Sequence, residues 1–176
     1  MTDYTHYVAT QHPAVALPPR DLETRITDKE SPDIRLWLRM LSCCNLIETE
    51  VRSRLRTEFQ TTLPRFDLLS QLTHTPKGLK MSELSRLMMV SNGNITGIAD
   101  QLEKDGLIER QRNETDRRSS LLRLTQKGRR YYRRMQSAHD SWIQSLLGGM
   151  APSARSSLFE LLGDLKRTTH TRLPVA

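Results

Sequence analysis

The spacing of apolar and polar residues between positions 82 and 128 predicts two short amphipathic helices in succession. Leu84, Leu87 and Met88 are spaced i, i+3, i+4, which places them on one face of a short helix. After a break at residues 90–92, the same period continues at Ile95, Ile98, Ala99 and Leu102. Two helices joined by about three residues are typical of a helix-turn-helix.

The residues around the second of these helices predict its two ends and a β-hairpin after it. Ser91 is a suitable N-cap, and Gly106 stands where the end of a helix favours a positive φ. Two strands are predicted at about 107–112 and 119–125, with residues 113–118 as the hairpin tip. The pattern therefore indicates a helix-turn-helix followed by a strand–turn–strand wing.

Further helices are predicted on both sides of this segment. A long helix begins at residues 31–33 and runs to about Phe59, because its apolar positions keep a helical period. The other predicted elements are a helix from Leu63 to about Thr75, a minimal edge strand at Leu79-Lys80, a long helix capped by Thr125 that ends at Gly148-Gly149, and a last helix from Pro152. We expect a mainly α fold with a small antiparallel β wing, in which long dimerisation helices flank a winged helix-turn-helix.

The predicted elements divide the chain into three kinds of region. Residues 1–32 contain four prolines and no sustained period, so we expect a flexible N-terminal arm. Residues 63–125 form the predicted winged helix-turn-helix module that binds DNA. Residues 33–62 and 126–176 carry apolar faces that this module does not need, so we expect them to build a homodimer interface. A dimer would offer two recognition helices to DNA half-sites about one helical turn apart.

The positive charge of the chain is concentrated in and just after the predicted wing. The whole chain has a net charge of +7, from 27 Lys and Arg against 20 Asp and Glu. Residues 107–134 hold ten basic and three acidic side chains, so the rest of the chain balances at seventeen of each. A charged run can be an ordinary solvated face, but this one lies beside a helix-turn-helix. Its position favours a surface that contacts the phosphates of double-stranded DNA.

The second helix of the predicted pair carries small or hydrogen-bonding residues opposite its apolar stripe. An ordinary solvated face would have a similar composition, but the basic wing that follows favours a face that approaches base edges in a major groove. The residues of this polar face are Asn92, Gly93, Asn94, Thr96, Gly97, Asp100 and Gln101.

Several classes of protein have no support in the sequence. No apolar stretch is long enough to span a membrane, and no signal peptide is recognisable, so a cytoplasmic location is expected. The five histidines and the adjacent Cys43 and Cys44 show no metal-ligand spacing. Neither a phosphate-binding glycine loop nor a nucleophile motif is present. We therefore predict no catalytic residues, no metal, no cofactor and no enzymatic activity.

The chain resembles the MarR family of bacterial winged-helix regulators. The resemblance rests on LSRLMMVSNGNITGIADQLEKDGLIER, on Asp116-Arg117-Arg118, and on Leu124-Thr125 followed by Gly128. It covers roughly residues 33–170 and leaves the N-terminal arm outside. It implies a homodimeric repressor that binds a palindromic operator, with Asp116 supporting the wing and Arg118 entering the minor groove. The residues expected to serve DNA binding are Ser91, Asn92, Asn94, Thr96, Arg112, Asp116, Arg117 and Arg118.

The resemblance also implies a small ligand that releases the protein from DNA. In similar proteins, aromatic acids or related ligands bind between the dimer helices and the DNA-binding lobe. Our candidate contacts are Trp37, Met40, Cys44, Arg65, Phe66 and Leu69. Each apolar candidate has plain core packing as its alternative, whereas Arg65 could be solvated or could hold an anion. The stretches LWLRMLSCCNLIE and TTLPRFDLLSQL further resemble a branch that controls aromatic catabolism and senses aromatic CoA thioesters.

Three alternatives stay open beside a ligand-responsive repressor. One is a thiol-based redox sensor that uses Cys43 or Cys44, although adjacent cysteines in a helix more often serve as small buried hydrophobes. Another is a DNA-binding protein without any ligand. A nucleic-acid enzyme comes last, because no metal or nucleophile cluster accompanies the basic surface.

Overall fold

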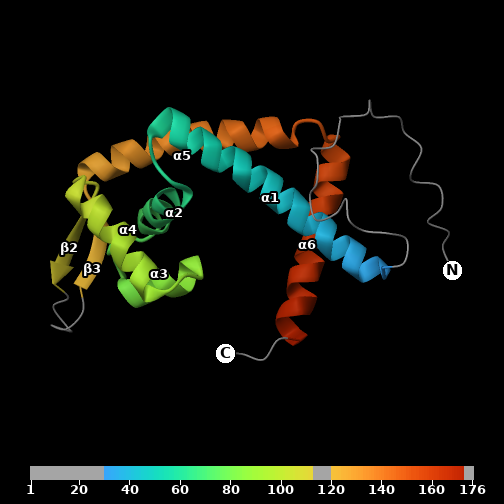
Figure 1. The fold of residues 1–176 in the computed structure, drawn as a ribbon, viewed down its shortest axis with the longest axis horizontal. Helices are drawn as coiled ribbons and strands as arrows, with labels where there is room; N and C mark the ends of the chain where they lie inside the picture. Colours follow the sequence, from blue (N-terminus) through green and yellow to red (C-terminus); the bar gives the residue numbers. More distant parts are fainter. Residues whose placement is uncertain (1–29, 113–119, 173–176) are drawn as a thin grey trace. The chain divides into compact units, whose positions relative to one another are not determined.

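Six helices and three strands make up the part of the chain that the computed structural model describes, residues 30–112 and 120–172. The elements are α1 (Pro32–Phe59), α2 (Leu63–Thr73), β1 (Leu79–Lys80), α3 (Met81–Met88), α4 (Asn92–Lys104), β2 (Ile108–Arg112), β3 (Ser120–Leu124), α5 (Gln126–Leu147) and α6 (Pro152–Arg172) (Figure 1). This mainly helical fold with one small antiparallel sheet confirms the predicted fold class. The hairpin tip and all but the end of the predicted N-terminal arm lie outside the described residues.

The starts of α4 and α5 and the end of α4 form as their sequence predicts. The Ser91 hydroxyl caps α4 by accepting a hydrogen bond from the Asn94 amide at 3.4 Å. Thr125 caps α5 in the same way, accepting from the Gly128 amide at 2.9 Å. Gly106 has a φ of +69° just after α4, as expected for the residue that turns the chain into the wing.

The wing is the outer part of a three-stranded antiparallel sheet with the order β1-β3-β2. Leu122 in the central strand pairs with Leu79 of β1 on one side and with Arg110 of β2 on the other. Leu122 and Leu124 are buried, whereas the alternate residues of β3 are only partly buried. This alternation anchors one face of the sheet on the core.

The start of α5 is locked against the end of α4 through Thr125 and Gly128. The Thr125 amide donates to the Leu107 carbonyl at 3.1 Å, and the Thr125 hydroxyl donates to the Gly106 carbonyl at 2.8 Å. A methyl group at Gly128 would overlap the Leu107 carbonyl oxygen, so only glycine fits there. This close approach is the physical reason why a glycine follows Thr125 three positions later in the sequence.

The chain divides into two compact units, Met1–Leu46 and Ile47–Ala176, and the boundary falls inside α1. The hydrophobic core belongs to the second unit. It joins the second half of α1, α2 and α5 to the helix-turn-helix and the sheet, with Leu55, Leu68, Leu84, Ile95, Leu102, Leu122 and Met135 among its fully buried side chains. The residues predicted as a DNA-binding module, 63–125, therefore share one core with parts of the two predicted dimerisation segments.

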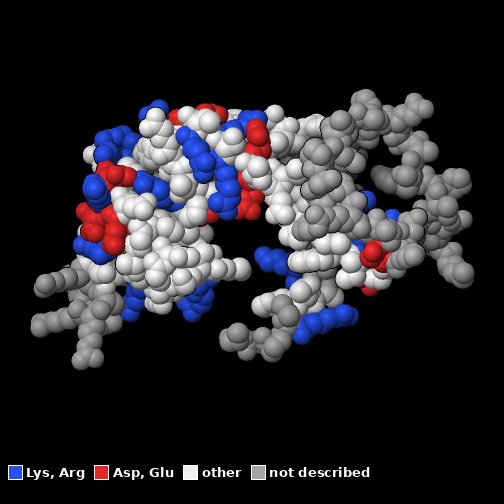
Figure 2. All heavy atoms as spheres, in the orientation of Figure 1, with Lys and Arg blue, Asp and Glu red and all other residues white. Residues whose placement is uncertain are grey.

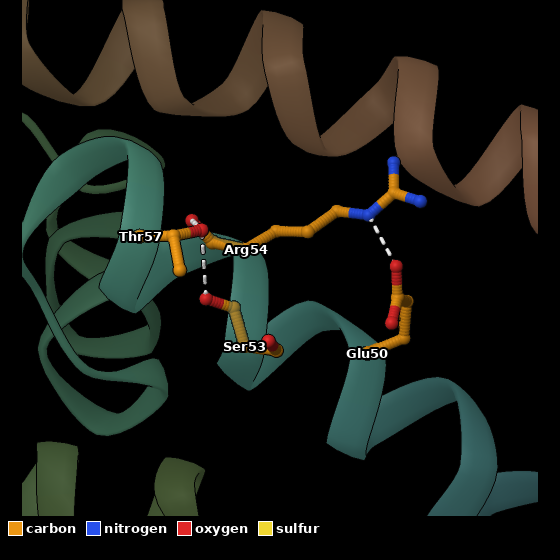
Figure 3. Close-up of polar contacts among 4 residues, drawn as sticks. All are labelled: Glu50, Ser53, Arg54 and Thr57. Carbon is orange, nitrogen blue, oxygen red and sulfur yellow. Dashed lines mark hydrogen bonds and ion pairs between the residues drawn. The ribbon is translucent and has the colours of Figure 1, made fainter.

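Contacts between α1 and α5 close one side of this core. Figure 3 shows the Arg54 side chain reaching from α1 toward α5, with its Nε 2.6 Å from a carboxylate oxygen of Glu50. Its guanidinium carbon lies 5.9 Å from the ring centre of Trp142 on α5, within the range of a cation–π contact. The Tyr131 hydroxyl donates to the Phe59 carbonyl at 2.7 Å. These contacts hold the end of α1 against α5.

Candidate nucleic-acid interface

The first turns of α4 present polar side chains on an otherwise anchored helix. Ile95, Ala99 and Leu102 are buried on one face, while Asn92 and Asn94 are exposed on the other. Neither asparagine side chain makes a hydrogen bond to another described residue. Each amide therefore keeps both its donor and its acceptor for an external partner.

The two hydroxyl groups predicted on this face are partly engaged by the helix itself. Ser91 serves as the N-cap, and the Thr96 hydroxyl donates to the Asn92 carbonyl at 3.0 Å. Both residues are exposed. Ser91 and Thr96 thus shape the start of α4 and still offer oxygen lone pairs outward, so the free amides are the groups best suited to read a base edge.

The turn between α3 and α4 contains a left-handed residue that the sequence did not reveal. Met89 has a φ of +54°, and its side chain is 93% exposed. The Ser85 hydroxyl donates to the Val90 carbonyl at 2.5 Å and bridges the turn. This bond holds the turn between the two helices together. Methionine rarely adopts the left-handed region, which is why this conformation was not evident from the sequence.

A charged cluster ties the wing to the recognition helix. Arg110 of β2 forms ion pairs with Asp100 of α4 and, at 3.3 Å, with Glu103 of the same helix. From the sequence, Asp100 was predicted on the polar face of the second helix and Arg110 within the basic segment 107–134. The structure pairs the two side chains with each other, so part of the positive charge in this segment is balanced within the lobe. In Figure 2, acidic and basic side chains accordingly lie together over the edge of the lobe formed by α4 and β2.

Other members of the basic segment also bond within the lobe. Arg123 donates to the Lys77 carbonyl, Lys127 to the Asp105 carbonyl and Arg129 to the Leu124 carbonyl, at 2.7, 2.7 and 2.8 Å. The concentration of charge is therefore partly structural. Arg112 ends β2, and Asp116, Arg117 and Arg118 lie outside the described residues.

The six predicted ligand contacts are divided between the two units. Trp37, Met40 and Cys44 lie on the part of α1 that belongs to the first unit, where Trp37 is 55% exposed. Arg65, Phe66 and Leu69 lie on α2 in the second unit.

Two of the α2 candidates are core residues in this structure. Leu69 is fully buried, and the Phe66 ring packs against Tyr132 and His139 with ring centres 5.5 and 5.0 Å apart. Arg65 is different: it pairs with Asp105 and lies at the edge of a groove. Arg65 thus differs from its two neighbours in lining a groove rather than packing in the core.

The two cysteines do not follow their prediction. Cys43 and Cys44 were expected to act as small buried hydrophobes. Both thiols are instead free and exposed on α1. Successive residues of a helix lie on different faces, about 100° apart. Ser42 occupies the buried face of this turn, so Cys43 and Cys44 fall on its exposed faces.

A groove of about 600 Å³ lies where the ends of α1 and α4 meet the starts of α2 and α5. It is lined by Phe59, Gln60, Arg65, Asp105, Leu107, Lys127, Arg130, Tyr131 and Arg134. The four α5 residues are spaced i, i+3, i+4, i+7, so the signal was present in the sequence as one face of that helix. From the sequence, three of them were predicted only as part of a basic surface. Burial raises the pKa of the Tyr131 hydroxyl in this groove, and the positive charge of Arg65 opposes the rise.

Among the described residues, no group of three His, Cys, Asp or Glu side chains is placed to hold a metal ion. None of the described helices combines the length and apolar character that crossing a bilayer requires.

A helix-turn-helix with a three-stranded wing and an exposed polar recognition helix defines a winged-helix DNA-binding protein. The sequence profile of the MarR family matches residues 61–120. The regulator BilQ of Clostridium symbiosum is 30% identical over 96 residues, which are 54% of this chain and 67% of BilQ. This chain belongs to the MarR family and is a DNA-binding transcriptional regulator.

Two further similarities extend beyond the matched segment. The transcriptional activatory protein BadR of Rhodopseudomonas palustris is 28% identical over 141 residues, 78% of this chain and 72% of BadR. The structure of Sco3205, a MarR family regulator from Streptomyces coelicolor in complex with DNA, has the same fold with a TM-score of 0.69. That similarity covers 82% of this chain and 92% of Sco3205 at 20% identity.

Proposed function

We propose that the protein acts as a homodimer that binds a palindromic operator and leaves it when a small aromatic ligand binds. The observation that carries the DNA-reading part is the pair of unbonded, exposed amides of Asn92 and Asn94 on a helix whose other face is buried in the core. Such amides recognise adenine through paired hydrogen bonds in the major groove.

We assign each residue of the proposed DNA interface a role from its chemistry and its position. Asn92, Asn94 and Thr96 read bases, and Ser91 fixes the start of the helix that carries them. Arg112, Arg117 and Arg118 contact phosphates or the narrow minor groove, which attracts arginine by its negative potential. Asp116 supports the hairpin tip. Arg110 does not belong to this set, because its charge is used within the lobe.

Dimerisation is supported by the apolar surface of the outer helices. None of the residues of α6 is buried within the described chain, and its exposed side chains include Leu158, Phe159, Leu161, Leu162 and Leu165. Exposed apolar surface of this size marks an interaction site in a soluble protein. A second copy of the chain is the proposed partner, because a dimer matches a palindromic operator.

The proposed ligand is an aromatic carboxylate, either free or as its CoA thioester. Support comes from the sequence resemblance to regulators of aromatic catabolism and from Arg65, a half-buried cation beside aromatic side chains. Of the six predicted ligand contacts, this proposal keeps Arg65, because Phe66 and Leu69 are packed in the core and Trp37, Met40 and Cys44 belong to the first unit. A shift in DNA affinity requires the ligand to bind the DNA-free form more tightly.

A redox response is a second candidate function, favoured by the exposure of Cys43 and Cys44. Accessible thiols are open to oxidation, unlike buried ones. Peroxide treatment of the wild type and of the double variant Cys43→Ser/Cys44→Ser distinguishes the two candidates. If only the wild type loses operator binding on oxidation, the thiols are the switch.

Selection of bound sequences from a randomised DNA library tests the DNA-reading proposal. The wild type should enrich a palindrome, and Asn94→Ala should lose preference at one position in each half-site, because one side-chain pair to a base contributes roughly 1–3 kcal/mol of discrimination. Asn45→Ala removes an exposed amide from α1 and serves as the matched control. A uniform loss of affinity across all sequences would make Asn94 a phosphate contact, and the absence of any enriched motif would contradict sequence-specific binding.

A further inference from the structure

One face of α5 gathers three cations around a tyrosine. Lys127, Arg130 and Arg134 line the same groove as Tyr131, and all four side chains come from two turns of the helix. Like charges at this spacing repel one another by a few tenths of a kcal/mol or more. The arrangement therefore costs the isolated helix stability, and an anion that sits among the cations would relieve the repulsion.

The intramolecular partners of the groove leave most of this positive charge uncompensated. Asp105 is the one acidic residue among those lining the groove, and its carboxylate pairs with Arg65. Lys127 donates to the Asp105 backbone carbonyl at 2.7 Å, which leaves its charge in place. Arg130 and Arg134 form no hydrogen bond or ion pair with any residue in the described ranges. Three cationic charges thus face the groove without a counterion from the described chain.

Arg65 gives independent evidence that this groove lacks a hydrogen-bond acceptor, because its Nε has no partner in the described chain. Its side chain is 18% exposed, and one of its terminal nitrogens is held by Asp105. Its Nε is buried, yet no acceptor within the described chain reaches it. A buried donor without a partner is unfavourable, and native proteins normally supply one. A bound anion at the edge of the groove would provide that acceptor.

The remaining walls of the groove suit a planar ring. Phe59 and Tyr131 meet edge to face with ring centres 6.4 Å apart, and the hydrogen bond from Tyr131 to the Phe59 carbonyl holds this pair in place. Leu107 adds an apolar side chain. A volume of about 600 Å³ lies within the range of small-molecule sites.

We propose that this groove is a binding site for an organic phosphate that carries a planar ring, of the nucleoside diphosphate type. A single carboxylate would neutralise one of the three uncompensated positive charges, whereas a diphosphate can neutralise all three. Guanidinium groups bind phosphate through two parallel hydrogen bonds to its oxygens. The nucleotide end of a CoA thioester has the same chemistry, so the site would also serve the ligand proposed above. The binding claim itself does not depend on that function.

Isothermal titration of the full chain with ADP, adenosine and pyrophosphate tests the proposal. ADP should bind, pyrophosphate more weakly, and adenosine weakest, because the cations supply most of the attraction. Arg130→Ala and Arg134→Ala should each weaken ADP binding about tenfold or more, since each removes a charge-assisted hydrogen bond. Arg133→Ala removes the neighbouring exposed arginine, which does not line the groove, and should leave ADP affinity unchanged. Circular dichroism melting of each variant verifies that it is folded.

Two results would overturn the proposal. One is an absence of ADP binding to the wild type, or an equal loss in Arg133→Ala, which would mean general attraction to a basic surface. The other is unchanged ADP affinity in Arg130→Ala and Arg134→Ala together with weaker DNA binding and a smaller salt dependence, which would assign the groove to the DNA backbone. Failure to find an operator would contradict the proposed function but not ADP binding, so the two failures are distinguishable.

Discussion

Gly93 and Gly97 lie one turn apart on the exposed side of the recognition helix α4. A side-chain methyl group at either position would have no neighbouring heavy atom within 4 Å, so the fold of the chain itself does not need glycine there. Glycine in a helix interior costs about 1 kcal/mol relative to alanine. We infer that these glycines allow another molecule to approach the helix backbone closely, and DNA is the molecule this helix is proposed to meet.

We expect Gly97→Ala to separate stability from DNA binding. The substitution should raise the free energy of unfolding by about 0.5–1 kcal/mol, because alanine favours the helix. It should also weaken operator binding, because the added methyl group lies on the face proposed to enter the groove. Urea unfolding measures the first effect and fluorescence anisotropy with labelled operator the second. Unchanged operator affinity would show that close approach at this position is not needed.

Asp67 on α2 predicts a pH dependence of stability. Burial raises the pKa of its carboxyl group above the ordinary value of 3.8, while the positive charge of Arg52 opposes the rise. A raised carboxyl pKa favours the protonated form in the folded state, so the stability that Asp67 contributes is present below 3.8 and is lost as the pH rises through the folded pKa.

Asp67→Asn should therefore be more stable than the wild type at neutral pH, and the difference should shrink as the pH falls toward 3.8. Urea unfolding at a series of pH values measures the difference. Asp140→Asn removes an exposed carboxylate from α5 and controls for the loss of one negative charge. A stability gain that does not change with pH would contradict the assignment to Asp67.

At the scale of elements, the ion pairs of Arg110 join the recognition helix α4 to strand β2 of the wing. Asp100 and Glu103 are one turn apart on α4, and both reach the same guanidinium on β2. The pairs are partly exposed, so their contribution to stability is small, below about 1 kcal/mol. We expect their greater effect to be geometric, because they join the two elements that are proposed to meet the major and minor grooves.

Arg110→Ala should weaken operator binding without the electrostatic signature of a lost phosphate contact. Removing one such contact lowers the slope of log K against log salt by roughly 0.9, whereas loss of an internal ion pair should leave the slope nearly unchanged. The charge reversal Asp100→Arg/Arg110→Asp should recover part of the affinity that Arg110→Asp alone loses. A slope reduced by a full contact, with no recovery in the double variant, would place Arg110 on the DNA.

At the scale of the whole molecule, the proposed dimer uses apolar residues that the single chain leaves exposed. Phe159 is 76% exposed and Leu161 66% on α6, far more than the core residues of the second unit. Phe159→Glu/Leu161→Glu should convert the protein to a monomer, because charges in an apolar interface are costly to desolvate. Light scattering after gel filtration measures the mass. Ser157→Glu, on the same helix, controls for added charge. A wild-type monomer, or a variant that stays dimeric, would contradict the proposal.

The sequence alone predicted the features of this fold that depend on near neighbours in the chain. Helix periods, the caps Ser91 and Thr125, the positive φ of Gly106 and the positions of the strands along the chain all follow from residues within a few positions of each other. The polar face of α4 was predicted for the same reason, since the face opposite a buried stripe is exposed. Cys43 and Cys44 show the limit of this reasoning. The sequence of a helix does not reveal which of its faces other elements cover, so the exposure of these thiols was not predicted.

The partners of charged and polar side chains were decided only by the tertiary structure. The paired residues Arg65 and Asp105 are forty positions apart in the sequence. Arg123 donates a hydrogen bond to the carbonyl of Lys77, forty-six positions before it. A count of charges cannot distinguish a cation that binds a phosphate from one that bonds within the lobe, so neither the ion pairs of Arg110 nor the groove beside α5 was foreseen. The physical reason is that hydrophobic periodicity is a local property of the chain, whereas an ion pair or a cavity exists only once distant segments have packed around a common core.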